Sequence, residues 1–316
     1  MSDVAFIPAE SVTRERRPAI GYAMALGAGA LAALNGSVSK VILESGLSSL
    51  RLTEVRCTGA LLGLALILFS TRPQSLRTNR RELLYLAAFG VFGVALVQLF
   101  YFLAIHRLEI GVSLLIQYLG PLLVALYARF VMKQHVRRRL WVALTLALGG
   151  LTFVVDLWHG VSLDGLGVLF SLCSAVTFAA YMLLAERAVG RRDPISLLCY
   201  GFLFATVFWA IAQPWWTFPF DVPGTTVSLL GNLSHLHLPI WALLAWMIVL
   251  GTIVPFFLIV GSMRHITATR AGILAMVEPV LASLVAYGWL DETLGGTQLV
   301  GGAIVLCGIA LAQSAR

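Results

Sequence analysis

The chain has 316 residues, of which 59% are hydrophobic and 12% charged, and its mean hydropathy is +0.90. Soluble proteins are about half apolar and about a quarter charged, so this chain has more apolar surface than one core can bury. The composition excludes a soluble globular protein and predicts an integral membrane protein. A net charge of +7 can indicate a protein that binds nucleic acid. Whether it does so here depends on where the basic residues lie along the chain.

The N-terminal segment 1–18 carries charged residues ahead of an apolar run and has no clear cleavage site. This pattern favours a short tail followed by an anchor that stays as the first span. A span needs about 20 mostly apolar residues, and ten runs meet that length. They are residues 19–41, 50–70, 83–104, 109–131, 138–156, 164–187, 195–214, 239–262, 267–290 and 296–314. The predicted fold is therefore an all-α polytopic membrane protein with ten transmembrane helices.

The longest connection, residues 215–238, is too polar and proline-rich to span a membrane. Its aromatic residues suit an interfacial belt: Trp215, Trp216, Phe218 and Phe220.

The basic residues predict the orientation. With the N-terminus in the cytoplasm, 17 of the 22 Lys and Arg residues fall on the cytoplasmic side, among them Arg14, Arg16, Lys133, Arg270 and Arg316. Four others fall on the opposite side, and Arg129 lies within a span. The positive-inside rule thus places both termini on the cytoplasmic side of the membrane. We expect this membrane to be a plasma membrane of the bacterial inner-membrane type. The basic charge is explained by topology, and nucleic acid is not an expected partner.

A weak internal repeat supports this layout. Residues 97–153 align with 255–311 at a shift of 158, which places Pro121 on Pro279 and Gly150 on Gly308. Five spans in each half would insert the second half upside down, and the loops agree: "MKQHVRRR" in the first half is basic, whereas "LDETLGG" in the second is acidic. We expect two inverted five-helix repeats, residues 19–156 and 164–314, an arrangement typical of transporters.

Several segments carry a resemblance to a known family. They are Asn35-Gly36 with Lys40, Arg56, "IQYLGPLLVALYA" (116–128), "AMVEPVLASLVAYGWLDETL" (275–294) and "GGAIVLCGIAL" (301–311). The chain resembles the EamA-type transporters of the drug/metabolite transporter superfamily along nearly its whole length. Members usually carry a Glu shortly after the fourth-span and ninth-span prolines; Glu292 fills the second place, but Lys133-Gln134 occupies the first. The resemblance implies movement of amino acids or other small metabolites, often outward.

Glu278 and Pro279 lie near the middle of the ninth span. A proline cannot donate to the carbonyl four residues earlier, so it frees the carbonyl of Ala275 beside the Glu278 carboxyl. These groups would suit a proton or a substrate ammonium; the alternative is a structural residue that packs against a neighbouring helix. In the fourth span, Pro121 stands in the same relation to Gln117, and Tyr118 adds a hydroxyl.

Other polar residues inside spans are candidates for the same cavity, since such residues are functional or join helices. Arg56 has no acidic residue three or four positions away, so we expect it to face a wet cavity where it could meet a carboxylate. The predicted substrate-binding set is Asn35, Arg56, Gln98, Gln117, Tyr118, Tyr181 and Glu278, and the predicted hinges are Pro121, Pro255 and Pro279.

The sequence indicates no metal or cofactor. The four cysteines lie in apolar runs without paired spacing, His235 and His237 form a lone HxH in a loop, and no GxxxxGK[ST] motif occurs. We therefore predict a secondary transporter that exports amino acids or related metabolites by alternating access, with protons as one candidate coupling ion. The alternative is an intramembrane lipid-modifying enzyme. Such an enzyme needs acidic residues clustered for acid–base chemistry, whereas the acidic residues of this chain are scattered. A receptor or scaffold gives no reason for an inverted repeat.

Overall fold

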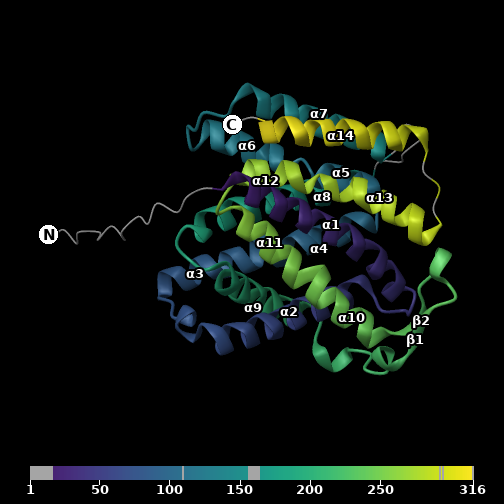
Figure 1. The fold of residues 1–316 in the computed structure, drawn as a ribbon. Coiled ribbons are helices and arrows are strands. Elements are labelled where there is room, and N and C mark those ends of the chain that lie inside the picture. Colours follow the sequence, from purple (N-terminus) through teal and green to yellow (C-terminus); the bar gives the residue numbers. More distant parts are fainter. Residues whose placement is uncertain (1–16, 109, 156–163, 292, 294, 315–316) are drawn as a thin grey trace.

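The computed structural model describes residues 17–108, 110–155, 164–291, 293 and 295–314, and it is a bundle of long helices (Figure 1). Most of the predicted tail, with Arg14 and Arg16, lies outside the described residues, as do Glu292 and Arg316. Six helices run without interruption. They are α1 (Pro18–Leu43), α2 (Ser49–Thr71), α7 (Arg138–Val154), α8 (Gly165–Val189), α9 (Pro194–Ala212) and α14 (Gly296–Ser314).

These helices begin where the sequence provides start signals. A proline occupies the first turn of α1 and of α9, where its missing N–H has no partner to lose. The Ser48 side chain accepts from the N–H of Arg51 at the start of α2, and Asp164 accepts from Gly167 at the start of α8. Such caps satisfy backbone donors that the helix itself leaves open. The boundaries therefore lie within a few residues of those predicted.

The third apolar run is not a regular α-helix. It consists of α3 (Arg80–Ala88), a π-helical segment η2 (Phe89–Ala95) and α4 (Leu96–Ile105). In the second half, α10 (Ile240–Ile248), the π-helical segment η6 (Val249–Ile253) and α11 (Val254–Ser262) follow the same plan. Pro255 is the second residue of α11, two positions after the end of η6. A π segment shifts the helix face locally, and such segments are frequent at functional sites.

Two further runs are broken. The fourth consists of α5 (Ile110–Gln117) and α6 (Gly120–Phe130), and the ninth of α12 (Ala268–Ala275) and α13 (Val277–Leu290). The breaks fall at Tyr118–Leu119 and at Met276, a short distance before Pro121 and Pro279. This position follows from the proline ring, which disrupts the turn that precedes it. Tyr118 and Met276 are also separated by the 158 residues of the sequence repeat.

Nine helical stretches in the described part of the chain are long and apolar enough to cross a membrane. The protein is thus a multi-pass helical membrane protein. The remaining predicted span, 138–156, corresponds to α7, which has 17 residues and ends at Val154, while residue 156 lies outside the described part. A helix of that length is about 25 Å long, against roughly 30 Å for the hydrocarbon core.

Helices α7 and α14 form a close pair along one side of the bundle (Figure 1). Small residues allow this contact. A Cβ added at Gly150 would lie 2.8 Å from the carbonyl oxygen of Gly301, and one added at Gly308 would lie 2.8 Å from that of Ala143. Backbones that approach this closely gain van der Waals contact along their length, which is how helices associate in lipid.

Helices α2 and α9 are joined at both ends. At one end the Arg51 guanidinium forms an ion pair with Glu54 (2.6 Å) and donates to the carbonyl oxygens of Gln213 and Pro214, just after α9. At the other end Arg72 donates to Asp193 (3.0 Å), the residue that caps α9. Carbonyls left open at the end of α9 thus gain a charged donor, and α2 is held along α9.

The connection 215–238 is folded, which the expectation of an all-α chain missed. It contains 3-10 turns η3 (Trp215–Thr217), η4 (Val222–Gly224) and η5 (Gly231–Leu233) and an antiparallel pair, β1 (Thr226–Ser228) with β2 (His237–Pro239); a further turn, η1 (Pro73–Leu76), follows α2. Of the four aromatic residues predicted for an interfacial belt, Phe218 does not face outward. Trp216 is 84% and Phe220 70% exposed, but Phe218 is buried in an apolar cluster with Ile240 and Val41. Phe218 packs inward because this connection has a core of its own.

Candidate functional site

A cavity of about 250 Å³ lies between helices of both halves of the chain. It is bordered by α1, α2, η2, α4 and α5 from the first half and by α8, η6, α11, α12 and α13 from the second. Six of the seven residues predicted to bind substrate line it: Asn35, Arg56, Gln98, Gln117, Tyr181 and Glu278. The predicted hinge Pro255 also lines it. The cavity brings together polar groups that are up to 243 residues apart in the chain, from Asn35 to Glu278.

The two helix breaks meet beside this cavity. Glu278 is the second residue of α13, directly after the break at Met276, and Tyr118 lies in the break between α5 and α6. The Tyr118 hydroxyl donates to Oε2 of Glu278 (2.9 Å) and lies 3.4 Å from the carbonyl oxygen of Ala275. That carbonyl is the one Pro279 was predicted to leave open. Tyr118 itself is not among the residues that line the cavity; it contacts the site through Glu278.

Arg56 supplies the positive charge of the cavity. Its Nε donates to the Thr252 hydroxyl (3.1 Å), and that hydroxyl donates in turn to the carbonyl of Met247 (2.9 Å), five residues earlier across η6. No direct ion pair joins Arg56 to Glu278 among the interactions of the described residues, although both line the cavity. One basic and one acidic side chain thus line the same cavity without a salt bridge between them in the described part of the chain.

Three amide side chains, those of Asn35, Gln98 and Gln117, also line the cavity. Gln98 donates from Nε2 to the carbonyl of Val94 (3.2 Å), and the Ser174 hydroxyl lies 3.0 Å from Oε1 of Gln117. Oδ1 of Asn35 and Oε1 of Gln98 are buried without a hydrogen-bond partner in the described part of the chain. An unsatisfied buried acceptor is costly, so a donor from a ligand or water would stabilise this wall. Gly251 makes room for Asn35, because a Cβ there would overlap the Asn35 side chain.

A row of aromatic rings forms another wall, which the sequence analysis had not predicted. Phe178, Tyr181 and Phe256 all line the cavity. Tyr181 stacks on Phe178 with ring centroids 6.3 Å apart and meets Phe256 edge to face at 5.8 Å. The Tyr181 hydroxyl has no hydrogen-bond partner among the described residues. Phe178 and Tyr181 are three residues apart on α8, so helical spacing from a polar candidate was the signal that could have found Phe178.

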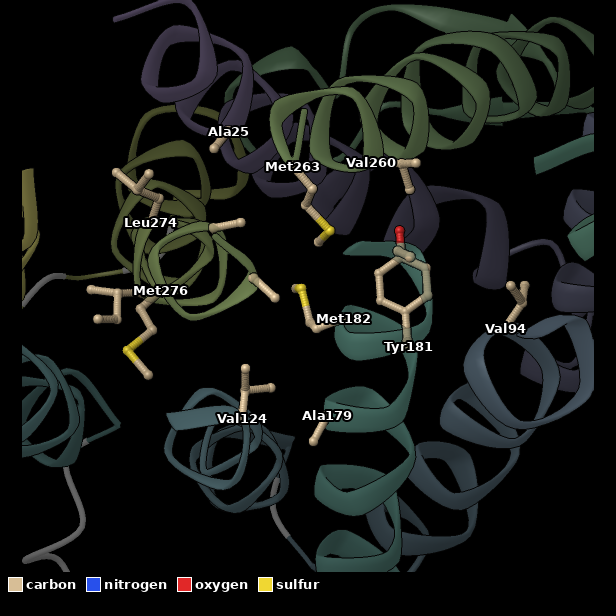
Figure 2. Packing of buried hydrophobic residues seen from close by; sticks show 14 of the residues in the cluster. Ala25, Val94, Val124, Ala179, Tyr181, Met182, Val260, Met263, Leu274 and Met276 are labelled. Atoms are coloured by element: carbon tan, nitrogen blue, oxygen red, sulfur yellow. The ribbon is translucent and has the colours of Figure 1, made fainter. Parts of the chain in front are cut away.

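Apolar side chains pack beside the cavity. Figure 2 shows the side chains of Met182 on α8 and Met263, after α11, directed toward one another, with Leu274 on the neighbouring helix α12. Met182 lines the cavity, and each of the three residues is at most 5% exposed. Methionine packs in irregular gaps with little strain, which suits Met182 and Met263 to this buried apolar cluster.

The other candidate sites are dispersed. Among the described residues, no group of three or more His, Cys, Asp and Glu is gathered as a metal site would require. His235 is exposed just before β2, and His237 is exposed as the first residue of β2. Cys57 and Cys199 are buried as packing residues, whereas Cys307 is exposed on α14. The candidate site is therefore the cavity and the helix breaks that border it.

A multi-pass helical membrane protein with a polar cavity between its two halves has the features of a transporter. Comparison with known proteins agrees. The model of the EamA-like transporter family matches the chain twice, over residues 19–156 and residues 165–313. The chain belongs to the EamA-like transporter family, within the drug/metabolite transporter superfamily.

Its relatives are transporters. An uncharacterized transporter of Archaeoglobus fulgidus is 30% identical over 284 residues, which cover 89% of this chain and 93% of the relative. The threonine/homoserine exporter RhtA of Salmonella typhimurium is 27% identical, covering 89% of this chain and 84% of the exporter. A solved structure, described only as a crystal structure of protein, has a TM-score of 0.71 at 19% identity and covers 92% of this chain and 96% of its own, which shows the shared fold.

Proposed function

We propose that the protein is a secondary transporter that exports amino acids or related small zwitterions across the plasma membrane by alternating access. The observation that carries this proposal is the pair Arg56 and Glu278, which present opposite charges to one cavity from the two halves of the chain. A zwitterion supplies both counter-charges: its carboxylate meets Arg56 and its ammonium meets Glu278. The relation to a threonine/homoserine exporter supports the same class of substrate.

The architecture that we propose is ten transmembrane helices in two inverted repeats, with α7 as the fifth span. Three features support it: the family model matches twice, and the π segments and helix breaks recur in both halves. The α7–α14 contact adds a fourth. Gly150 faces Gly301 and Ala143 faces Gly308, and a shift of 158 residues exchanges these two contacts with each other. This reciprocity is what a two-fold relation between two elements produces.

We further propose that Glu278 couples transport to protons. A carboxylate inside a membrane protein can be neutralised by a proton or by an ammonium, but one site does not hold both cations at once. Binding a proton from outside and releasing it inside would then drive export of the substrate in the other direction. The cytoplasmic location of both termini belongs to the same proposal and is supported by the distribution of basic residues.

Counterflow in proteoliposomes tests the proposal. We expect the purified protein to exchange threonine or homoserine, and to exchange poorly the matching amine without a carboxylate and the matching acid without an ammonium. Arg56→Lys should raise the half-saturation concentration about tenfold, because a lysine lacks the planar pair of donors that binds a carboxylate. Arg107→Lys, at an exposed pair with Asp164, is the matched control and should leave exchange unchanged. Equal exchange of all three compounds would contradict the proposal, and lipid turnover without counterflow would favour the enzyme alternative.

A further inference from the structure

We infer that Tyr118 is a positioning residue: its hydroxyl donates to Glu278 or to the Ala275 carbonyl, depending on whether Glu278 is occupied. Through this hydrogen bond, the break in one half of the chain is linked to the break in the other. This inference rests on the proposed function of Glu278. Tyr118 was predicted to touch substrate, but the structure places its hydroxyl 2.9 Å from Oε2 of Glu278 and leaves it outside the cavity lining.

The geometry gives the hydroxyl two competing acceptors. Oε2 of Glu278 is at 2.9 Å and the carbonyl oxygen of Ala275 at 3.4 Å. A tyrosine hydroxyl carries one proton and donates one strong hydrogen bond. Both acceptors belong to the ninth span, one on each side of its break at Met276, whereas Tyr118 belongs to the break of the fourth span.

The charge of Glu278 decides between them. Hydrogen bonds to an ionised acceptor are roughly twice as strong as neutral ones, so an empty, ionised Glu278 holds the hydroxyl. A bound proton removes the charge of the carboxylate and a bound ammonium compensates it, so the hydrogen bond from Tyr118 weakens. The Ala275 carbonyl, which Pro279 deprives of the donor four residues later, then competes for the same hydroxyl proton. Occupying Glu278 therefore weakens the link from Tyr118 to α13 and shifts it toward α12, on the other side of the break in the ninth span.

The surroundings of Tyr118 favour this role over direct binding. The ring is 3% exposed and meets Phe178 edge to face, with centroids 6.2 Å apart. Nearby, Pro121 of α6 packs on Gly272 of α12, where a Cβ would lie 2.9 Å from the proline Cγ. The ring is thus closely packed, and rotation of its O–H bond is enough to change the acceptor.

Thermal unfolding of the substrate-free protein in detergent tests the link without any assumption about the substrate. Tyr118→Phe removes the donor, Glu278→Met removes the acceptor at similar length, and Glu278→Gln retains a neutral acceptor. In a double-mutant cycle, we expect Tyr118→Phe and Glu278→Met to be non-additive by about 2 °C or more, with a smaller coupling for Glu278→Gln. Tyr200→Phe is the matched control, since its hydroxyl donates to the carbonyl of Leu76 (2.6 Å), and its effect should add to that of Glu278→Met.

Counterflow then tests positioning. Because the hydrogen bond is stronger to the empty carboxylate than to the occupied one, Tyr118→Phe should lower the half-saturation concentration by up to about tenfold, the factor that corresponds to about 1.4 kcal/mol for one hydrogen bond to a charged group. The change should be less than twofold when Glu278→Gln is already present. Tyr200→Phe should change neither value. Additive unfolding effects for Tyr118→Phe and Glu278→Met would overturn the link, and so would unchanged half-saturation in a protein that does exchange zwitterions. If the wild type exchanges no zwitterion, the proposed function fails, while the unfolding cycle still decides whether Tyr118 and Glu278 are coupled.

Discussion

At the scale of single residues, the unusual feature is that two charges are kept apart in a membrane interior. Ionisable groups there are costly and usually pair with one another. Arg56 is held by the Thr252 hydroxyl and Glu278 by the Tyr118 hydroxyl, so each charge has a neutral partner. In the proposed function, this arrangement leaves both groups to bind a zwitterion, which a direct Arg56–Glu278 pair would compete against.

Glu278→Gln preserves the shape of the side chain and removes its charge. If Glu278 binds both the substrate ammonium and the coupling proton, the variant should lose accumulation driven by a proton gradient, and its half-saturation concentration in exchange should rise. If Glu278 couples protons only, exchange should stay at the wild-type level while gradient-driven accumulation is lost. Both quantities are measured in proteoliposomes with and without an imposed gradient. A variant with wild-type values for both would show that Glu278 serves only the packing of the ninth span.

At the scale of helices, the two halves interrupt their third and fourth spans at matching places. Pro121 and Pro279 explain the breaks at Tyr118–Leu119 and Met276. A third proline, Pro255, lies shortly after the π segment η6. The segment η2 contains no proline; it contains Gly90 and Gly93, whose missing side chains admit the carbonyl oxygen of Gly201 and the Tyr181 backbone. The interruptions lie around the cavity, where a change of helix geometry would alter its shape most.

Replacing the prolines should slow transport without unfolding the protein. Pro121→Ala and Pro279→Ala each restore a backbone donor, and the N–H gained in Pro279→Ala would compete with Tyr118 for the Ala275 carbonyl. Because alanine favours a helix, the double variant should express normally and show straighter helices, with a lower maximal rate of counterflow. Pro73→Ala, in the exposed turn η1, is the control. An unchanged rate in the double variant would mean that the breaks are packing details.

Adjacent glycines on α7 provide a test of the α7–α14 contact. A Cβ at Gly150 would lie 2.7 Å from the backbone nitrogen of Val305, whereas a Cβ at Gly149 would meet nothing within 4 Å. Gly150→Ala should therefore push the helices apart and destabilise the protein by about 1–3 kcal/mol, the usual effect of overpacking. Gly149→Ala should leave thermal unfolding in detergent unchanged or raise it slightly. Equal unfolding temperatures for the two variants would show that α7 and α14 separate at little cost.

At the scale of the whole molecule, the distribution of charge predicts how the bundle lies in the membrane. The basic loops and both termini are expected on the cytoplasmic side, and the folded connection 215–238 on the other. That connection contacts the far end of the ninth span, where Trp289 donates to the carbonyl of Leu229 (2.8 Å) and Asn232 donates to that of Gly288 (3.2 Å). The predicted outer surface therefore has a structured layer above the helices.

Single cysteines test this orientation. On a background without the four native cysteines, cysteines at Gln74 and Ser314 should be protected from impermeant thiol reagents in intact cells, and a cysteine at Thr225 should be labelled. All three positions are exposed in the structure, so protection would reflect the membrane and not burial. Labelling at Gln74 in intact cells would contradict the model in which ten spans place both ends inside.

The sequence by itself determined the class of protein, the positions of the apolar helices and the places where two of them break. Hydropathy and proline are local signals: an apolar run must face lipid or protein, and a proline disrupts its own helix whatever surrounds it. The polar residues inside spans could likewise be named one by one, because any such residue needs a reason to be there.

Only the tertiary structure decided which of these groups meet. Tyr118 pairs with Glu278 across 160 residues of chain, Phe178 and Phe256 join Tyr181 in one wall, and Phe218 turns into a core that the sequence did not predict. Helical periodicity shows which residues share a face, but in an apolar chain nearly every face is suitable for burial. The choice among faces depends on close packing of particular shapes, such as Gly150 against Gly301, and that packing exists only once the helices are assembled.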